Sequence, residues 1–321
     1  MSEPLLCGVL TLTPTHCGTG QAAGAVDLPI AREVHTGLPV LPASTLKGVI
    51  RSWFGAPEDE ELRAVVNELF GPPPPRRRRG DDQTAARPEI EQEAVSLEAG
   101  KLVFLEGMLL AFPVRSLTGV FRWTTAPMLV SRLRRLLRAL GSRHADSLTC
   151  PEPEENEVLV PSGHSGPLSL EDLVFPPERC RAVAELEPLG RRLGAFVSAD
   201  NDDQDRRGLT SRLVVVPDAV LQDLTRRGTA VTARIVLDPD RKTSDNLWYE
   251  ETLPPDTLFA VVISDRPGAS HRDERRPAER LREIAEERGG PNRKSRHGYI
   301  GGNVTVGQGL VRWTLDVELG S

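Results

Sequence analysis

Aromatic residues are scarce in this sequence: Phe, Trp and Tyr together make up 4% of its 321 residues. Many RNA-binding modules recognise bases by stacking them on aromatic side chains of a sheet, and this composition supplies that kind of recognition poorly. Any nucleic-acid binding by the chain is therefore expected to rest on backbone phosphates, which give affinity without sequence preference.

Cysteine clusters and long apolar runs are also missing. The 4 cysteines have no Cys-x-x-Cys spacing, so neither a disulfide framework nor a zinc site is expected. No run approaches the ~18 apolar residues that indicate a membrane-spanning helix, and the first residues lack the charged and apolar regions of a signal peptide. We therefore expect a cytoplasmic protein with no membrane contact.

Neither sign of charge dominates, because 40 Lys and Arg stand against 46 Asp and Glu, for a net charge of −6. This balance argues against non-specific coating of nucleic acid and leaves room for a local basic groove. The length and a hydrophobic content of 39% predict a globular chain with a real core, as one large domain or two ordinary ones.

The stretch from residue 13 to residue 54 contains a basic amphipathic helix. Ser44 is placed to cap its first turn, and Gly55 is placed to end it. Lys47 and Arg51 lie four residues apart, where two cations repel each other unless an anion lies between them, so the pattern predicts a phosphate-binding helix. The buried stripe, at i, i+3, i+4 and i+7 spacing, consists of Leu46, Val49, Ile50 and Trp53.

Two candidate polar residues precede this helix. His16 leads into Gly18-Thr19-Gly20, where glycines allow positive φ or a close approach by another part of the chain. Asp27 stands before Leu28 and Pro29, and the proline restrains Leu28 to extended geometry, so the carboxylate is held in place. Spacing alone favours a turn aspartate and a packed histidine over a functional pair.

Two later segments are strongly polar. Residues 72–94 begin with four prolines and four arginines and are expected to be a disordered or mobile insertion. Its arginines fit RNA binding or simple solvation, and blocks of like charge usually stay exposed. Residues 199–208 are rich in Asp but lack the Glu that an EF-hand requires at its twelfth position, so we interpret them as an exposed hairpin tip.

A basic helix and a glycine loop are the remaining features. The helix opens at Pro127 with leucines inward and arginines 132, 134, 135 and 138 outward, which fits RNA, a neighbouring subunit or solvent. The loop at 298–309 matches neither a Walker A nor a Rossmann motif and is followed by an alternating strand. Such a loop can present backbone amides to phosphates; its candidate residues are Gly301, Gly302, Gly307 and Gly309.

Strands and helices alternate along the chain, and both terminal segments read as strands. This order predicts an α+β fold with an RRM-like, ferredoxin-like βαββαβ sheet, formed by residues 1–321 as a single domain with helical and loop insertions.

Several segments resemble a known family. They are D-L-P-I-x-R-E-x-x-T-G-L-P from residue 27, P-x-S-x-L-K-G-x-x-R from residue 42, and residues 111–127, 212–218, 242–259 and 300–312. Together they resemble the CRISPR-associated RAMP superfamily and, more narrowly, the backbone subunit (the fourth Cmr protein) of type III-B effector complexes. Each motif alone is moderately specific, but their order and number span most of the chain.

The resemblance implies a guide-RNA-binding subunit that stacks into a helical filament with other copies and other Cmr-type subunits. It also implies an endoribonuclease that cuts guide-paired target RNA, leaving a cyclic phosphate and a 5′-hydroxyl, with a divalent metal, Mg or Mn. The implied essential carboxylate and metal ligand is Asp27, with His16, Glu250 and Glu251 as helpers. Neighbouring strand residues face opposite sides, so only one of that glutamate pair, Glu250 by preference, is expected to face Asp27.

In such subunits a protruding thumb wedges between bases of the guide–target duplex, and residues 190–212 are the corresponding region here. An alternative function is an RNA-binding scaffold of the same complex that does not cleave. The aspartate at position 27 favours the catalytic version. A guide-processing endonuclease of the same superfamily is disfavoured, because the motifs match the backbone subunit.

Overall fold

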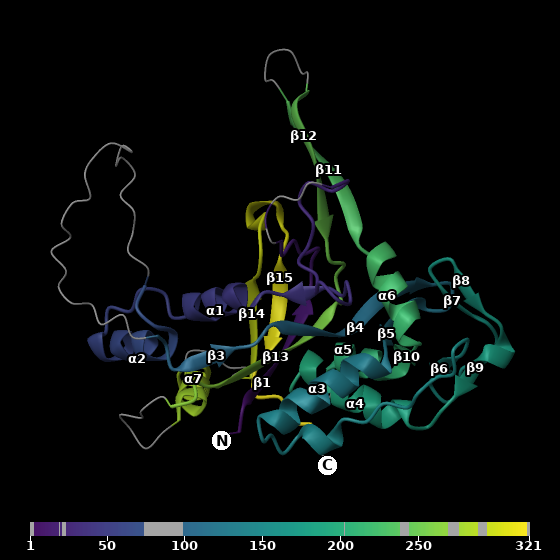
Figure 1. The fold of residues 1–321 in the computed structure, drawn as a ribbon, viewed down its shortest axis with the longest axis horizontal. Coiled ribbons are helices and arrows are strands. Elements are labelled where there is room, and N and C mark those ends of the chain that lie inside the picture. The colour runs from purple at the N-terminus through teal and green to yellow at the C-terminus, as the bar shows by residue number, and fades with distance from the viewer. Residues whose placement is uncertain are drawn as a thin grey trace.

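The fold is described from a computed structural model that covers residues 3–18, 20, 24–73, 99–201, 203–237, 244–268, 276–287 and 294–319 (Figure 1). Apart from its first two prolines, the Pro/Arg-rich insertion expected at 72–94 lies outside these residues. In the described part of the chain, no helix combines the length and the apolar character that crossing a membrane requires.

One large mixed sheet forms the centre of the molecule. Its four central strands pair antiparallel in the order β15–β1–β13–β4, with β1 hydrogen-bonded to both β13 and β15. The sheet continues through β5, β10, β6 and β9, and the pairs β5–β10 and β6–β9 are parallel. The strand bounds are β1 Leu5–Thr11, β2 Val40–Leu41, β3 Leu102–Phe104, β4 Gly107–Ser116, β5 Val120–Thr125, β6 Val158–Val160, β9 Cys180–Ala182, β10 Leu213–Val215, β13 Leu258–Asp265, β14 Ser295–Tyr299 and β15 Leu310–Thr314.

Helices cover both faces of this sheet. Because successive strand residues point to opposite faces, Cys7 and Val9 of β1 join one apolar cluster while Leu6 and Leu10 join the other. The first cluster is covered by α1 (Ala43–Ser52), α2 (Glu60–Phe70), α6 (Asp218–Arg227) and α7 (Pro277–Glu287), and the second by α3 (Pro127–Ala139), α4 (Leu186–Val197) and α5 (Gln204–Arg212). These findings confirm a mixed α and β architecture.

The start of α1 differs from the sequence prediction. The apolar stripe is confirmed, with Leu46 and Ile50 fully buried. Ser44, however, is not the cap: the helix begins one residue earlier at Ala43, and Pro42 precedes it with no side-chain hydrogen bond. The Pro42 carbonyl accepts the first helical bond, from Leu46 N–H at 3.1 Å. The fixed φ of proline is compatible with this helix entry.

A long hairpin is the element that stands out from the body. Strands β11 (Ala230–Leu237) and β12 (Ser244–Thr252) pair antiparallel from Ala230↔Thr252 to Leu237↔Ser244. Figure 1 shows this pair projecting well beyond the sheet, with its foot next to α6. A short second hairpin, β7 (Leu168–Leu170) with β8 (Leu173–Phe175), lies beside the end of β4, where the Arg115 carbonyl accepts Glu171 N–H at 3.0 Å.

The prediction of a hairpin tip at residues 199–208 is wrong. Asp203 accepts hydrogen bonds from the N–H groups of Asp205 and Arg206, so it caps a helix, α5, that starts at the next residue. Helix α5 packs against α4, and a Cβ on Gly190 would lie 2.9 Å from Thr210 Cα. The described part of the segment 190–212 therefore consists of two packed helices, and not of the protruding hairpin that was expected to act as an RNA-wedging thumb.

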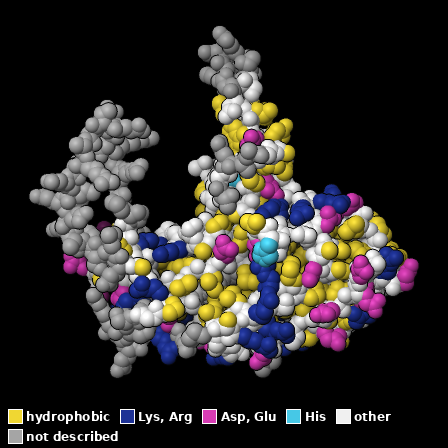
Figure 2. Space-filling view, in the orientation of Figure 1, with side chains coloured by type: hydrophobic (Ala, Val, Ile, Leu, Met, Phe, Trp, Pro, Cys, Tyr) yellow, Lys and Arg dark blue, Asp and Glu magenta, His cyan; other side chains and the backbone are white. Residues whose placement is uncertain are grey.

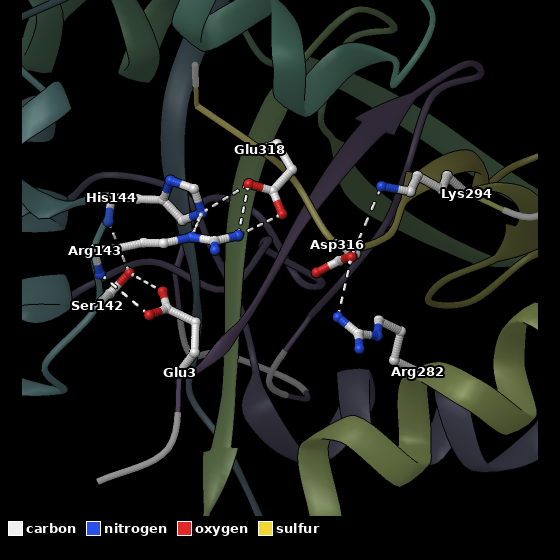
Figure 3. A network of polar contacts seen from close by, with 8 residues as sticks. All are labelled: Glu3, Ser142, Arg143, His144, Arg282, Lys294, Asp316 and Glu318. Atoms are coloured by element: carbon white, nitrogen blue, oxygen red, sulfur yellow. Dashed lines mark hydrogen bonds and ion pairs between the residues drawn. The ribbon is translucent and has the colours of Figure 1, made fainter. Parts of the chain in front are cut away.

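The two ends of the described chain are joined by polar contacts (Figure 3). The Glu3 carboxylate accepts hydrogen bonds from Ser142 Oγ at 2.5 Å and from Arg143 N–H at 3.2 Å. The Arg143 guanidinium donates to Glu318 at 2.7 and 2.9 Å, and His144 Nε2 lies 3.3 Å from the same carboxylate. Because the side chains of Arg143 and Glu318 are exposed, their ion pair contributes below about 1 kcal/mol.

Close packing of α4 on β1 gives a test of this fold. A Cβ on Gly8 would lie 1.8 Å from the Phe196 carbonyl oxygen, whereas Gly48 in α1 faces open space. We expect Gly8→Ala to lower the free energy of unfolding by more than about 3 kcal/mol, because the helix must move off the sheet. Gly48→Ala, the control, should be neutral or stabilising by up to about 1 kcal/mol. Chemical denaturation measures both, and equal stability of the two variants would contradict this packing.

Candidate active site

Asp27 is held against the backbone of β12. The segment that follows it runs beside this strand as a short parallel bridge, Leu28↔Glu250. Leu28 N–H donates to the Tyr249 carbonyl, and Glu251 N–H donates to the Leu28 carbonyl, both at 3.0 Å. The Asp27 carboxylate itself accepts Tyr249 N–H through Oδ2 at 2.8 Å. Three backbone groups of the hairpin thus fix the position of one carboxylate.

The same carboxylate borders a surface cavity of about 320 Å³, lined by Asp27, Leu28, Asn246, Leu247 and Trp248. Asp27 is half-buried, and its Oδ1 has no hydrogen bond to the described residues. An ionised carboxylate oxygen in this position accepts hydrogen bonds from a ligand hydroxyl.

Glu250 lies buried at the foot of the hairpin, with 1% of its surface exposed. Its Oε2 accepts Arg234 Nε–H at 3.2 Å, and its Oε1 accepts the side-chain amide of Asn303. His16 Nδ1 lies 3.8 Å from the same Oε1. A buried carboxylate needs such partners to offset its loss of hydration, and here they come from the hairpin, the glycine loop and the N-terminal loop.

The ring of His16 is oriented by the hairpin backbone. Its Nδ1 lies 2.8 Å from the Glu251 carbonyl oxygen. Since a carbonyl only accepts, Nδ1 carries the proton, and Nε2 of the neutral ring is left as an acceptor. Gly18 leaves room for the ring, because a Cβ there would lie 2.7 Å from Nε2.

Glu251 points to the opposite side from Glu250, into a separate set of partners. Arg32 Nη2 donates to its Oε1 at 2.6 Å, Thr229 Oγ1 donates to the same oxygen at 2.7 Å, and Ile30 N–H donates to Oε2 at 3.0 Å. Burial alone would raise the pKa of this carboxyl, but the hydrogen bonds and charge of Arg32, with the Thr229 and Ile30 bonds, hold the pKa below its ordinary value. Two of these three donors, Arg32 and Ile30, belong to the segment that follows Asp27, so Glu251 holds that segment onto β12.

Arg32 ties the Asp27 segment to two other elements. Besides Glu251, its guanidinium donates to the Gly37 carbonyl at 2.9 Å and to the Thr225 carbonyl at 3.2 Å. Because these acceptors lie at the end of α6 and in the loop before β2, one side chain joins α6, the hairpin and the loop. The arrangement fixes the course of the chain after Asp27.

The glycine loop docks against the His16 segment. A Cβ on Gly301, which has φ +84°, would lie 1.9 Å from the His16 carbonyl oxygen, so only glycine fits. Gly302 N–H donates to that same carbonyl at 3.0 Å, and Gly309 N–H donates to the Pro14 carbonyl at 2.9 Å.

The rest of the glycine loop turns through left-handed residues. Gly307 has φ +83° and donates its N–H to the Val304 carbonyl at 3.0 Å, at the end of the 3-10 turn Val304–Val306. Asn303, at φ +60°, brings its amide to Glu250. The amides of Gly302, Gly307 and Gly309 therefore already have backbone acceptors. These three N–H groups are not free to bind a phosphate, and the loop instead shapes the site.

Helix α1 lies next to the His16 segment, since Cys17 makes a side-chain hydrogen bond with Thr45. Burial outweighs this bond and raises the pKa of the Cys17 thiol to about 11. Lys47 is half-buried and forms no hydrogen bond or ion pair with the described residues. Arg51 is not paired with it over an anion: its guanidinium donates to the Gly71 carbonyl and, at 2.9 Å, to Asn67 Oδ1. Arg51 thus binds the end of α2. Of the two cations predicted to bind phosphate together, Lys47 is the one without a protein partner among the described residues.

The structure brings His16, Glu250 and the glycine loop together at the foot of the hairpin, and it places Asp27 on the backbone of β12 at Tyr249. Sequence reasoning missed four partners of the glutamate pair, namely Arg32 and Thr229 of Glu251 and Arg234 and Asn303 of Glu250. Arg32 and Asn303 lie within the motifs at 27–39 and 300–312, which were a usable signal. Thr229 and Arg234 lie outside the quoted motifs, so only the fold reveals them.

A ready-made metal site is not part of this arrangement. Within the described ranges, no group of three or more His, Cys, Asp or Glu side chains is placed to hold a metal ion. Glu250 and Glu251 are each occupied by protein donors. Asp27 is a single carboxylate, so the described residues do not by themselves fit a resident Mg²⁺ or Mn²⁺.

Comparison with known proteins gives the family. Residues 9–312 match the model of the RAMP superfamily. The chain belongs to the RAMP superfamily. This RAMP protein is 32% identical to the CRISPR system Cmr endoribonuclease Cmr4 of Pyrococcus furiosus over 97% of its own length and 95% of that protein. The resemblance found in the sequence motifs is thereby confirmed.

Solved structures agree with this assignment. The crystal structure of oligomeric Cmr4 from Pyrococcus furiosus superposes on this RAMP protein with a TM-score of 0.68, at 28% identity and 98% coverage of both chains. A chain of the Type III-B Cmr-beta complex bound to cognate target RNA gives a TM-score of 0.70 at 19% identity, with 99% of both chains covered. At that identity the second match shows the fold.

We expect the contribution of the Glu251 network to the free energy of unfolding of this RAMP protein to depend on pH. A carboxyl whose folded pKa is lowered stabilises the fold above its unfolded pKa of 4.5, and that contribution is lost as the pH falls through the folded pKa. We expect Glu251→Gln to lower the free energy of unfolding by about 2 kcal/mol at pH 7, because the Arg32 charge loses its partner. The difference from wild type should shrink below about pH 4.

Denaturation curves at pH 7 and pH 3.5 test this expectation. The matched control is Glu187→Gln, which removes an exposed pair with Arg191 and should change stability by less than about 0.5 kcal/mol. Equal effects of the two variants at pH 7 would show that the Glu251 network stabilises the fold no more than an exposed ion pair does.

Proposed function

We propose that this chain is a guide-RNA-binding backbone subunit of a type III-B CRISPR effector complex and that it cleaves guide-paired target RNA. The single observation that carries the proposal is the Asp27 carboxylate, fixed by the hairpin backbone and open on one oxygen to a cavity, in a chain 32% identical to a Cmr endoribonuclease. The oligomeric relative supports stacking with further copies, and the Cmr-beta match supports an effector-complex fold.

The reaction needs a group that orients the target 2′-hydroxyl and takes its proton. The hydroxyl oxygen then attacks the adjacent phosphorus and the bond to the 5′-oxygen breaks. The departing 5′-oxygen takes a proton from water, so the products carry a 2′,3′-cyclic phosphate and a 5′-hydroxyl. Asp27 suits the first role because Oδ2 is held by Tyr249 N–H while Oδ1 is left to accept the hydroxyl. A carboxylate held in this way acts as a general base by geometry.

His16 and Glu250 act beside Asp27 in this proposal. The Nδ1–H of His16 is fixed on the Glu251 carbonyl, so Nε2 is the atom it offers to a ligand. Glu250 is engaged by Arg234 and Asn303. In this proposal it therefore holds His16 and the glycine loop in position. Glu251 positions the Asp27 segment and does not contact substrate.

A divalent metal belongs to the resemblance, although the described residues form no metal site on their own. Mg²⁺ commonly binds one or two carboxylates together with phosphate oxygens and water. Asp27 is the carboxylate of this chain that would hold it once RNA phosphates are present.

RNA backbone binding is assigned first to Lys47, the α1 cation without a protein partner among the described residues. Ser44 is exposed on the first turn of the same helix and offers a hydroxyl donor. Arg51 is engaged with the end of α2, and the glycines 301, 302, 307 and 309 act by shaping the loop that adjoins α1 and His16.

The thumb is assigned to the β11–β12 hairpin in place of residues 190–212. It projects from the body and exposes the apolar side chains of Val231, Ile235 and Leu247, which can pack against bases. The ferredoxin-like palm is also part of the proposal. It is supported by the antiparallel order β15–β1–β13–β4 with α1 after β1 and α7 before β15.

The alternative function is a scaffold that binds guide and target without cutting. Asp27→Asn separates the two, because the amide oxygen of Asn still accepts Tyr249 N–H while the charge is removed. We expect the complex with this variant to lose target cleavage by at least about 100-fold, with target affinity changed by less than about threefold.

Cleavage of 5′-labelled target RNA by the reconstituted complex, with Mg²⁺, with Mn²⁺ and with EDTA, measures this effect. The control is Asp146→Asn, an exposed residue paired with Arg138, which should cut at the wild-type rate. Cleavage by Asp27→Asn at the same positions and rate would make this chain a scaffold.

A further inference from the structure

The outer face of α3 carries a surface charge that the proposed site does not use. The helix contains four arginines and no acidic residue, in a chain whose net charge is −6. Its leucines 129, 133 and 137 are buried, so the arginines face outward. Figure 2 shows dark blue side chains running over α3, below the foot of the β11–β12 hairpin.

Two of the four arginines are already paired, and two are not. Arg132 binds Glu33 with two hydrogen bonds of 2.7 Å, and Arg138 binds Asp146 at 2.6 Å. Arg134 and Arg135 form no hydrogen bond or ion pair with the part of the chain that the structure describes. Two adjacent cations left without a counter-charge favour binding of an anion.

A third arginine extends this surface from α6. Arg226 is exposed, and its Nη2 would lie 3.0 Å from a Cβ on Gly37, so it lies over the turn at 33–37. Its guanidinium, too, forms no hydrogen bond or ion pair with the described residues. Nearby Asp223 is paired with Arg227, which leaves the charge of Arg226 uncompensated.

The turn at 33–37 connects these arginines to the Asp27 segment. Glu33 at its start binds Arg132 of α3, and the carbonyl of Gly37 at its end accepts Arg32, which also binds Glu251. The turn is thus held between α3 and the hairpin. Arg226 lies over this turn, and Arg134 and Arg135 lie on the helix that Glu33 joins to it. These three residues are here called the arginine strip.

We propose that the arginine strip binds the phosphate backbone of the target RNA strand as it leaves the Asp27 site. The inference rests on the proposed function for the identity of the RNA. Guanidinium groups donate several hydrogen bonds in a planar fork that matches phosphate oxygens. Phosphate contacts set the register of a strand without reading its sequence, which suits a subunit that must accept any target.

An acidic protein surface is the competing partner for such a strip. Protein interfaces have apolar, often aromatic, centres. Among the described residues of α3, α6 and the turn, Val34 is the exposed large hydrophobic side chain. A surface of unpaired arginines with a single exposed Val favours a polyanion over a protein.

The test measures target-RNA affinity of the assembled complex at several KCl concentrations for wild type and for Arg134→Gln/Arg135→Gln. Removing one cation that binds a phosphate reduces the slope of log K against log salt by about 0.7 to 0.9. We expect the slope to fall by roughly 1.5 and the affinity to fall roughly tenfold at moderate salt, with guide binding unchanged. Arg134→Lys/Arg135→Lys should restore most of the slope, because the charges return.

The matched control is Arg179→Gln/Arg266→Gln, which removes the same charge from two exposed arginines elsewhere on the surface and should leave the slope unchanged. The proposal is overturned if the strip variant has the wild-type affinity and slope, or the same loss as the control. It is also overturned if native mass spectrometry shows fewer copies per complex while RNA affinity per copy is intact, which would make the strip a protein interface. Binding is measured without cleavage, so failure of the nuclease proposal would be seen separately.

Discussion

The position of Asp27 depends on one strand, β12, hydrogen-bonding along both of its edges. One edge pairs with β11, and the other holds Leu28 and the Asp27 carboxylate. The N–H and carbonyl of a strand residue point to the same edge. Tyr249 therefore uses both groups on the Asp27 segment, and its neighbours on either side are left to pair with β11. The projecting hairpin and the candidate catalytic carboxylate form one backbone unit.

Two adjacent glutamates join this unit to the rest of the molecule. Because strand residues alternate in direction, Glu250 contacts Asn303 of the glycine loop while Glu251 contacts Arg32 of the Asp27 segment. Each is buried and satisfied by several donors, so removing a partner leaves an uncompensated charge. Under the proposed function, a duplex that tilts the hairpin would therefore also move Asp27.

The sequence predicted the parts of this arrangement that depend on local pattern. The stripe of Leu46 and Ile50 followed from helical periodicity, and the motif around Asp27 indicated the family. The cap prediction for Ser44 is wrong because Pro42, two residues earlier, stands at the cap position of α1. The hairpin tip predicted at 199–208 is wrong because Asp is also a preferred helix cap, and Asp203 caps α5. The partners of Glu250 come from distant residues such as Asn303, a contact that only tertiary structure reveals.

The claim that the β12 backbone orients Asp27 is tested most directly by Tyr249→Pro. Proline removes the N–H that binds the carboxylate, and that N–H faces away from β11, so the hairpin ladder keeps its bonds. Tyr249→Ala, which retains the N–H, is the control. Target cleavage by the assembled complex should fall at least about tenfold in the proline variant relative to the alanine variant, with equal target affinity. Equal cleavage by both would show that Asp27 does not depend on this bond.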